Sequence, residues 1–229
     1  MLDYDLHAPA VPREGAPLVV LLHGRGADKD DLAPLRRFLP DDAFLATPRA
    51  PFEGAPWGYG PGWAWYRYVA EDRPEPASFS GGQEALDQLL DALPARLPVT
   101  PGPLIVGGFS QGGTASLAWA LRHPGRAAGV AVLSGFLADH PDVRADPSTV
   151  ADTAIFWGHG TVDPAIPFAL ARKGRAALRA AGAALTERDY PMGHGIEAGE
   201  MKDLREWLDG VLDGGATPPR PPGSPPRWP

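Results

Sequence analysis

The stretch Gly108-Phe109-Ser110-Gln111-Gly112 places a serine between two glycines, after an apolar run and before a helix-forming segment. The order of strand, G-x-S-x-G turn and helix predicts a nucleophile elbow. A serine on so tight a turn needs small neighbours two residues away on either side, because larger side chains would collide with adjacent backbone. The chain contains 28 glycines, so the pentapeptide alone is equally compatible with an ordinary turn, and its surroundings must decide.

Short apolar runs and helical patterns alternate along the chain. The runs are nearly continuous and bounded by glycine, proline or polar residues, as expected of strands buried on both faces. They lie at residues 18–22, 43–46, 104–106, 130–133 and 154–157, and the helical patterns lie at residues 30–39, 82–97, 111–122, 164–181 and 197–212, the last preceded by a candidate strand at residues 185–190. This alternation predicts an α/β fold with a mainly parallel sheet and helices on both faces.

Length and composition exclude several classes of protein. The 229 residues fit one α/β domain, and the net charge of -7 argues against binding to nucleic acid or to an acidic membrane surface. The acidic balance leaves a small neutral or cationic substrate open. Without cysteine the chain has no thiolate nucleophile, disulfide or cysteine-ligated metal. No apolar run is long enough for stable membrane insertion and the first residues show no secretory signal, so we expect a cytoplasmic protein.

The C-terminal residues differ in kind from the rest. We assign residues 1–213 to a single domain and residues 214–229 to a proline-rich tail, whose composition is typical of disordered or polyproline-like segments. Its Pro-x-x-Pro patterns are nearly unavoidable at this proline density, so we do not expect a dedicated partner there. The sequence leaves the oligomeric state open, a homodimer included.

A second unusual segment runs from Pro48 to Pro76, rich in proline, tryptophan and tyrosine and without helical period. Long loops of this kind are usually functional or disordered. In one interpretation its aromatic side chains cover an edge of the sheet; in the other they form a wall of a substrate pocket. The residues that we expect to line such a pocket are Trp57, Trp63, Trp65 and Tyr66, together with Phe136 and Met192.

A serine nucleophile needs a base, and His194 is the best-placed histidine. It lies in a glycine-flanked loop after the expected last strand and before the final helix. His23 and His159 each precede a glycine at a strand terminus, where we expect them to brace loops. The remaining histidines, His7, His123 and His140, lie in terminal, polar or helix-end segments.

The base in turn needs an acid, for which Asp163 is the candidate. It follows the strand ending near Trp157 and therefore lies at the carboxyl edge of the sheet, where open parallel sheets bind ligands. Its alternative role is that of an N-cap, because it directly precedes Pro164. Asp139 and Asp142 are the fallback candidates, because they follow the preceding strand.

Two backbone N–H groups are expected to form the oxyanion hole. That of Gln111 starts the helix after the elbow. That of Arg25 lies between Gly24 and Gly26 after an earlier strand, where the glycines permit the necessary bend. The Arg25 side chain offers an additional attraction for a carboxylate.

Other interpretations of these motifs fail on spacing. Gly24-x-Gly26 lacks the third glycine of a dinucleotide fingerprint, because position 29 is lysine. The elbow lacks the lysine of a P-loop, because position 113 is glycine. A metal site built from His159, Asp163 and His194 would lack any regular ligand spacing. We therefore expect no metal and no cofactor.

With these residues assembled, the chain resembles the phospholipase/carboxylesterase family of α/β-hydrolases, which includes acyl-protein thioesterases and small bacterial carboxylesterases. The order Ser, Asp, His is that of the fold. The likeness is carried by residues 22–26, 47–51, 64–66 and 108–113, and by residues 159–164 with 192–194.

The resemblance implies an α/β-hydrolase fold without a large lid domain and a cofactor-free serine esterase acting on small-molecule carboxylic esters or thioesters of modest acyl length. It also implies Ser110 as nucleophile, His194 and Asp163 as its partners, and the amides of Arg25 and Gln111 as oxyanion hole. The chain departs from thioesterase-like members at Arg67, where an acid usually follows the aromatic pair. A non-catalytic ligand-binding module on the same fold is the alternative.

Overall fold

The computed structural model describes residues 1–70 and 72–214. Its main feature is a seven-stranded sheet in which every neighbouring pair is parallel except β1 with β3. The strands, in their order across the sheet, are β1 (Tyr4–His7), β3 (Phe44–Pro48), β2 (Leu18–Leu22), β8 (Leu104–Phe109), β9 (Gly129–Leu133), β10 (Ala154–Gly160) and β11 (Ala184–Tyr190). The five strands predicted from apolar runs and the candidate strand at residues 185–190 are all present, and the antiparallel edge strand β1 is additional.

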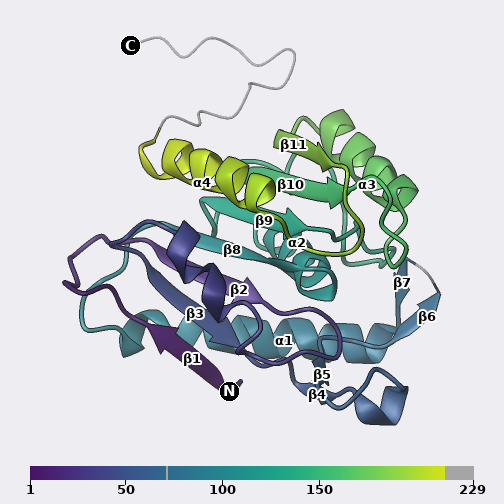
Figure 1. Ribbon diagram of the computed structural model, residues 1–229, viewed down its shortest axis with the longest axis horizontal. Coiled ribbons are helices and arrows are strands. Elements are labelled where there is room, and N and C mark those ends of the chain that lie inside the picture. Colours follow the sequence, from purple (N-terminus) through teal and green to yellow (C-terminus); the bar gives the residue numbers. More distant parts are fainter. Residues whose placement is uncertain (71, 215–229) are drawn as a thin grey trace.

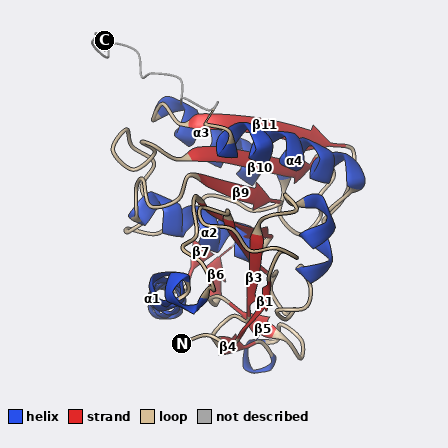
Figure 2. Cartoon of the chain, turned by 90° about the vertical axis from the view of Figure 1, so that its left-hand side faces the viewer, coloured by secondary structure: helices blue, strands red, loops and turns tan. Residues whose placement is uncertain are grey.

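Helices cover both faces of this sheet (Figures 1 and 2). On one face lie α1 (Pro76–Ala92), α2 (Gln111–Arg122) and α3 (Phe168–Ala180), and on the other α4 (Ala198–Leu212) and the 3₁₀ turn η1 (Ala33–Phe38). Successive strand residues point to opposite faces, so Val20 and Val106 join one core while Val19 and Ile105 join the other. Both cores are filled with apolar side chains, aliphatic and aromatic, which explains the nearly continuous apolar runs. The predicted α/β fold, a mainly parallel sheet with helices on both faces, is confirmed.

Helix boundaries differ from the predictions where local hydrogen bonds decide them. The helix predicted from residue 82 starts at Pro76, because the Glu75 carboxylate caps it by accepting from the N–H of Ser78 at 2.8 Å and proline suits the first helical position. It ends at Ala92, and a separate 3₁₀ turn, η3 (Pro94–Arg96), follows. The segment at 30–39 forms only η1, and α3 starts at Phe168 rather than at residue 164.

The aromatic segment forms small hairpins instead of a separate domain. The first pairs β4 (Phe52–Glu53) with β5 (Trp63–Ala64) around the 3₁₀ turn η2 (Ala55–Trp57), and the second pairs β6 (Tyr68–Ala70) with β7 (Arg73–Pro74). Within residues 1–70 and 72–214 no insertion is large enough to make a lid domain. The segment reaches the edge of the sheet where the carboxyl ends of the strands meet.

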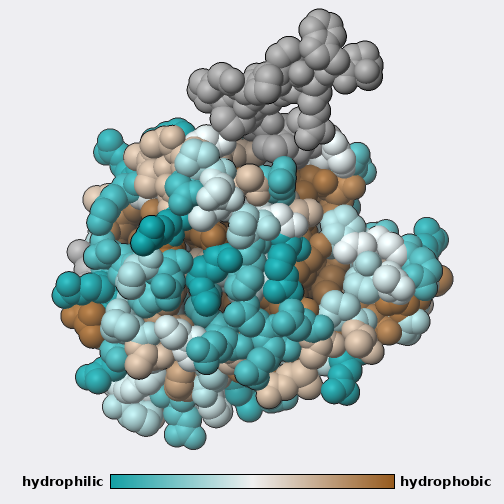
Figure 3. All heavy atoms as spheres, turned by 180° about the vertical axis from the view of Figure 1, so that it is seen from behind, coloured by the Kyte–Doolittle hydropathy of each residue, from teal (hydrophilic) through white to brown (hydrophobic). Residues whose placement is uncertain are grey.

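One face of the molecule is predominantly polar. Figure 3 shows teal and white over most of the face seen from behind, with small separate brown patches. No helix among the described residues is long and apolar enough to cross a membrane. The predicted tail lies outside the described residues, apart from Gly214.

Candidate active site

Ser110 occupies a strained turn between β8 and α2. Its φ of 56° and ψ of -117° lie outside the usual regions for a residue with a side chain, at a cost of about 1–3 kcal/mol. The surrounding backbone holds it there: the Ser110 N–H donates to the Leu133 carbonyl at 2.8 Å, and its own carbonyl accepts from the Thr114 N–H at 3.1 Å. The sequence forms a nucleophile elbow at the predicted position.

Close packing of backbone explains the two glycines of the motif. A Cβ on Gly108 or on Gly112 would overlap the carbonyl oxygen of Leu22 on the neighbouring strand β2. The elbow therefore approaches β2 more closely than any larger residue permits. The same contact brings the loop after β2, which carries Arg25, next to Ser110.

Ser110, His194 and Asp163 form a continuous chain of hydrogen bonds. His194 Nε2 lies 2.9 Å from Ser110 Oγ, and His194 Nδ1 lies 2.7 Å from Asp163 Oδ2. Because an ionised carboxylate can only accept, Nδ1 carries the proton and Nε2 accepts from the serine hydroxyl. This is the arrangement in which imidazole can remove the hydroxyl proton.

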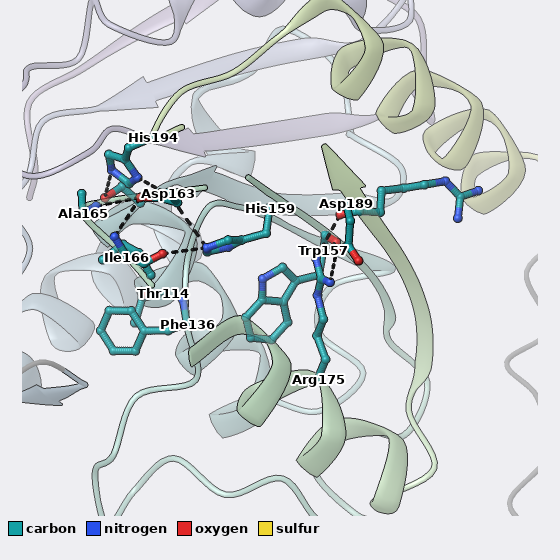
Figure 4. A network of polar contacts seen from close by, with 12 residues as sticks. Thr114, Phe136, Trp157, His159, Asp163, Ala165, Ile166, Arg175, Asp189 and His194 are labelled. Carbon is teal, nitrogen blue, oxygen red and sulfur yellow. Dashed lines mark hydrogen bonds and ion pairs between the residues drawn. The ribbon is translucent and has the colours of Figure 1, made fainter. Parts of the chain in front are cut away.

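Asp163 uses its two oxygens for different purposes. Oδ2 faces His194, whereas Oδ1 accepts the backbone N–H groups of Ala165 at 2.8 Å and Ile166 at 2.9 Å (Figure 4). Asp163 is therefore not the N-cap of α3, the alternative weighed from the sequence, because α3 starts at Phe168 with Pro167 as its N-cap. The two hydrogen bonds to Oδ1 form a turn at residues 163–166, which is why α3 starts after it. The carboxylate is fully buried, whereas the His194 ring is 22% exposed at the pocket.

Packing fixes the loop that carries His194. The imidazole lies against the Phe109 ring with centroids 4.7 Å apart. At the end of β10, a Cβ on Gly160 would overlap the carbonyl groups of Met192 and Gly193. Phe109, one position before the nucleophile, thus positions the base as well.

Two further histidines support the site, as predicted from their positions at strand ends. His159 Nε2 donates to the Ile166 carbonyl at 2.9 Å and lies 3.7 Å from Asp163 Oδ2. His23 Nδ1 donates to the Gly24 carbonyl at 2.7 Å, while its Nε2 accepts from the Ala50 N–H at 3.0 Å. Burial lowers the pKa of both rings, so both are neutral braces at neutral pH.

The loop after β2 and the start of α2 border the serine together. Gln111 is the first residue of α2, so no carbonyl of that helix accepts its N–H. The loop at Gly24 and Arg25 lines the same pocket as Ser110. Both predicted oxyanion donors therefore belong to segments that meet at Ser110.

The pocket beside Ser110 has a volume of about 530 Å³. Its wall combines apolar side chains with Arg25 and Asp31. The lining residues are Gly24, Arg25, Ala27, Asp31, Tyr68, Val69, Ala70, Phe109, Ser110, Ala165, Ile166 and His194. None of the six residues predicted for the pocket is among them, although Tyr68, from the same aromatic segment, is.

Two of the predicted wall residues of the aromatic segment are buried in the core. Trp65 and Tyr66 are each only 1% exposed, and the Trp65 indole N–H donates to the His23 carbonyl at 2.9 Å. Phe136 is equally buried, and Trp57 packs against Phe52. The Arg49 guanidinium lies over the Trp63 ring. The Met192 carbonyl accepts the backbone N–H of Val162 at 3.3 Å. None of these six residues therefore forms the wall of the pocket beside Ser110.

Neither fallback acid is joined to the base. Asp142 is 3.8 Å from His140 Nδ1, and the Asp139 N–H donates to the Asp72 carbonyl at 2.9 Å. Among the described residues no group of three or more His, Asp or Glu side chains is arranged to hold a metal ion.

Known proteins of one family resemble this chain in sequence and in fold. The profile of the phospholipase/carboxylesterase family matches residues 8–212. A probable carboxylesterase of Oryza sativa is 30% identical over 205 residues, covering 85% of this chain and 77% of its own. An acyl-protein thioesterase 1 of Cryptococcus neoformans is 27% identical over 228 residues, covering 88% and 95%. The crystal structure of a Bacillus cereus carboxylesterase superposes with a TM-score of 0.78 at 19% identity, covering 92% and 95%.

The protein is thus an enzyme with the α/β-hydrolase fold and a serine at its nucleophile elbow. More particularly, the chain belongs to the phospholipase/carboxylesterase family, the serine hydrolases that cleave esters.

Proposed function

We propose that the protein hydrolyses small-molecule carboxylic esters through an acyl-enzyme on Ser110. The observation that carries this proposal is the hydrogen-bonded chain from Ser110 Oγ through His194 to the buried Asp163 carboxylate, at the bottom of an open pocket. Family membership supports the reaction type.

In the first half-reaction, Ser110 Oγ attacks the ester carbonyl while its proton passes to His194 Nε2. The carbonyl oxygen becomes an oxyanion, which the N–H groups of Arg25 and Gln111 stabilise. His194 then returns the proton to the departing alcohol, leaving the acyl group on Ser110. Asp163 keeps the imidazole oriented and stabilises its charged form.

In the second half-reaction, water takes the place of the alcohol. His194 removes a proton from the water, and the water oxygen attacks the acyl carbonyl. His194 then returns the proton to Ser110 Oγ as the carboxylic acid leaves. No step of this scheme needs a metal or cofactor. Thioesters fit the same chemistry, with a thiol as the leaving group, and the thioesterase among the relatives supports testing them. The pocket volume suits small to medium acyl chains.

The test is the hydrolysis of p-nitrophenyl butyrate and of butyryl-thiocholine by wild type, Ser110→Ala and a matched exposed variant, Ser148→Ala. We expect turnover in wild type and Ser148→Ala, with a loss of at least about 10³-fold in Ser110→Ala. Turnover that persists in Ser110→Ala contradicts the proposal. Tight binding of hydrophobic ligands without turnover by wild type would favour the non-catalytic module instead. A homodimer and a cytoplasmic location stay predictions.

A further inference from the structure

Arg25 borders the catalytic pocket and has no ionic partner among residues 1–70 and 72–214. Neighbouring cations of the same region are paired: Lys29 Nζ lies 2.8 Å from an Asp5 oxygen, and Arg49 Nε lies 2.7 Å from an Asp28 oxygen. In the part of the chain that the structure describes, no carboxylate lies within 4.0 Å of the Arg25 guanidinium. One positive charge at the pocket is therefore available to a ligand.

Two tyrosines hold this guanidinium in place. Its Cζ lies 4.7 Å from the ring centroid of Tyr59 and 5.6 Å from that of Tyr68. A guanidinium over an aromatic ring uses its flat face for that contact and keeps the N–H groups along its edge for hydrogen bonds. Those N–H groups match the two oxygens of a carboxylate in spacing and direction.

The backbone ties these tyrosines to the loop that carries Arg25. Gly26 donates to the Trp63 carbonyl at 2.8 Å, and the Trp63 N–H donates to the Ala27 carbonyl, also at 2.8 Å. The Tyr59 hydroxyl accepts the Tyr68 N–H at 2.9 Å. At Gly26 the φ of 79° and the adjacent Tyr59 carbonyl both exclude a side chain. The guanidinium is thus held on a fixed support rather than on a free loop.

The rest of the pocket wall makes this charge stand out. Val69, Ala70, Phe109 and Ile166 give the wall an apolar character, and Asp31 is the acidic residue in it. Asp31 forms no ion pair with Arg25 among the described residues. The wall therefore carries a positive charge at Arg25 and a negative charge at Asp31. An anionic group on an ester is attracted by the first and repelled by the second.

We propose that this pocket selects esters that carry an ionised carboxylate close to the scissile ester, and that the Arg25 side chain binds that carboxylate. The inference rests on the proposed function and names its substrate class. The net charge of -7 does not oppose it, because exposed charges more than about 8 Å away are largely screened at physiological ionic strength. The nearby guanidinium decides the local preference.

The test compares pairs of esters that differ only in this charge. On the acyl side, monomethyl glutarate is compared with methyl 4-carbamoylbutanoate, in which an amide replaces the carboxylate. On the alcohol side, acetoxyacetate is compared with 2-acetoxyacetamide. We expect wild type to favour the carboxylate in kcat/KM by about tenfold or more in at least one pair, since hydrogen bonds between charged groups are stronger than neutral ones.

Variants assign the preference to Arg25. Arg25→Gln should bring the ratio of the two kcat/KM values close to one, and Asp31→Asn should raise it. Arg67→Gln is the matched control, because Arg67 is exposed on the same aromatic segment but does not line the pocket, and its ratio should equal that of wild type. Equal rates within both pairs in wild type, or an equal fall in Arg67→Gln, overturns the inference while leaving the esterase proposal intact. Failure to hydrolyse any of the four esters, together with p-nitrophenyl butyrate, contradicts both.

Discussion

The Gln111 side chain accepts the backbone N–H of Trp65 through Oε1 at 2.8 Å. Its Nε2 donates to the next carbonyl, that of Tyr66, at 2.7 Å. The residue after the nucleophile therefore fixes the main chain of the aromatic segment as well as presenting its own N–H to the site. Through the Trp65 indole, which donates to the His23 carbonyl at 2.9 Å, this support reaches the loop of the second oxyanion donor.

Replacing Gln111 by leucine tests this support. Two buried backbone groups would lose their partners, and each loss costs about 1–3 kcal/mol. We expect a lower free energy of unfolding in urea and a lower kcat, because the loop with Arg25 moves. Gln88→Leu, at an exposed position on α1, should change stability by less than about 0.5 kcal/mol. Equal free energies of unfolding of Gln111→Leu and wild type would show that the two hydrogen bonds of the Gln111 side chain do not stabilise the fold.

Asp163→Asn separates the two tasks of this residue. The asparagine oxygen can still accept from Ala165 and Ile166, but its NH₂ group faces His194 Nδ1 and forces the wrong tautomer. A loss of about 10⁴-fold in kcat with a near-native fold is expected, measured with p-nitrophenyl butyrate and by circular dichroism. Asp142→Asn, which changes the exposed fallback acid, should retain full activity; a comparable loss there would contradict the assignment.

Gly112→Ala should damage the elbow itself. The new Cβ would overlap the Leu22 carbonyl, so Ser110 must shift or the turn must open. We expect a loss of both stability and activity. Gly210→Ala is the matched control, since a Cβ at this α4 position meets nothing within 4 Å, and it should stabilise the protein by up to about 1 kcal/mol. Thermal unfolding and ester turnover measure both variants; a fully active Gly112→Ala would be inconsistent with the close approach of β2.

Glu200 makes stability depend on pH. It is completely buried on α4 against Gly158, and neither carboxyl oxygen has a hydrogen-bond partner among the described residues. Burial raises the pKa of this carboxyl from 4.5 to about 8. Between these values the unfolded chain is ionised while the folded protein keeps the proton. The free energy of unfolding therefore falls as pH rises through this window, by up to about 1.4 kcal/mol per pH unit.

Glu200→Gln removes that titration. Urea denaturation at pH 5, 7 and 9 should show the stability of the variant rising relative to wild type as pH increases, with no further change well above pH 8. Glu206→Gln, an exposed position on the same helix, serves as control. A constant difference between Glu200→Gln and wild type at all three pH values would contradict the buried, protonated state.

Much of the architecture is predictable because it depends on short-range patterns. Apolar runs locate five of the six parallel strands, and the glycines around Ser110 indicate the close backbone contact with Leu22. The start of α1 was missed although Glu75 and Pro76 form a recognisable cap, because the surrounding prolines suggest a loop. Strand β1 (Tyr4–His7) was not predicted, because it is short and partly polar and pairs with only one strand, β3, at the edge of the sheet.

The pocket wall was not predictable from residue type. Trp65 and Tyr66 have the size and chemistry of wall residues, but the long-range bonds from Gln111 draw them inward. Tyr68, two residues on, reaches the pocket instead, where burial raises its pKa to about 12. The position of α2 relative to this segment decides which of these aromatic side chains is buried and which lines the pocket. No local sequence pattern predicts that position.

The central claim is that Ser110 is the nucleophile that the hydrogen-bonded chain through His194 to Asp163 activates. The most direct measurement is incubation with a fluorophosphonate followed by peptide mass spectrometry, in wild type and in His194→Ala. We expect a single covalent adduct on Ser110 in wild type and labelling that is slowed by orders of magnitude in His194→Ala. An unlabelled Ser110 in folded wild-type protein, or equally fast labelling without His194, would contradict it.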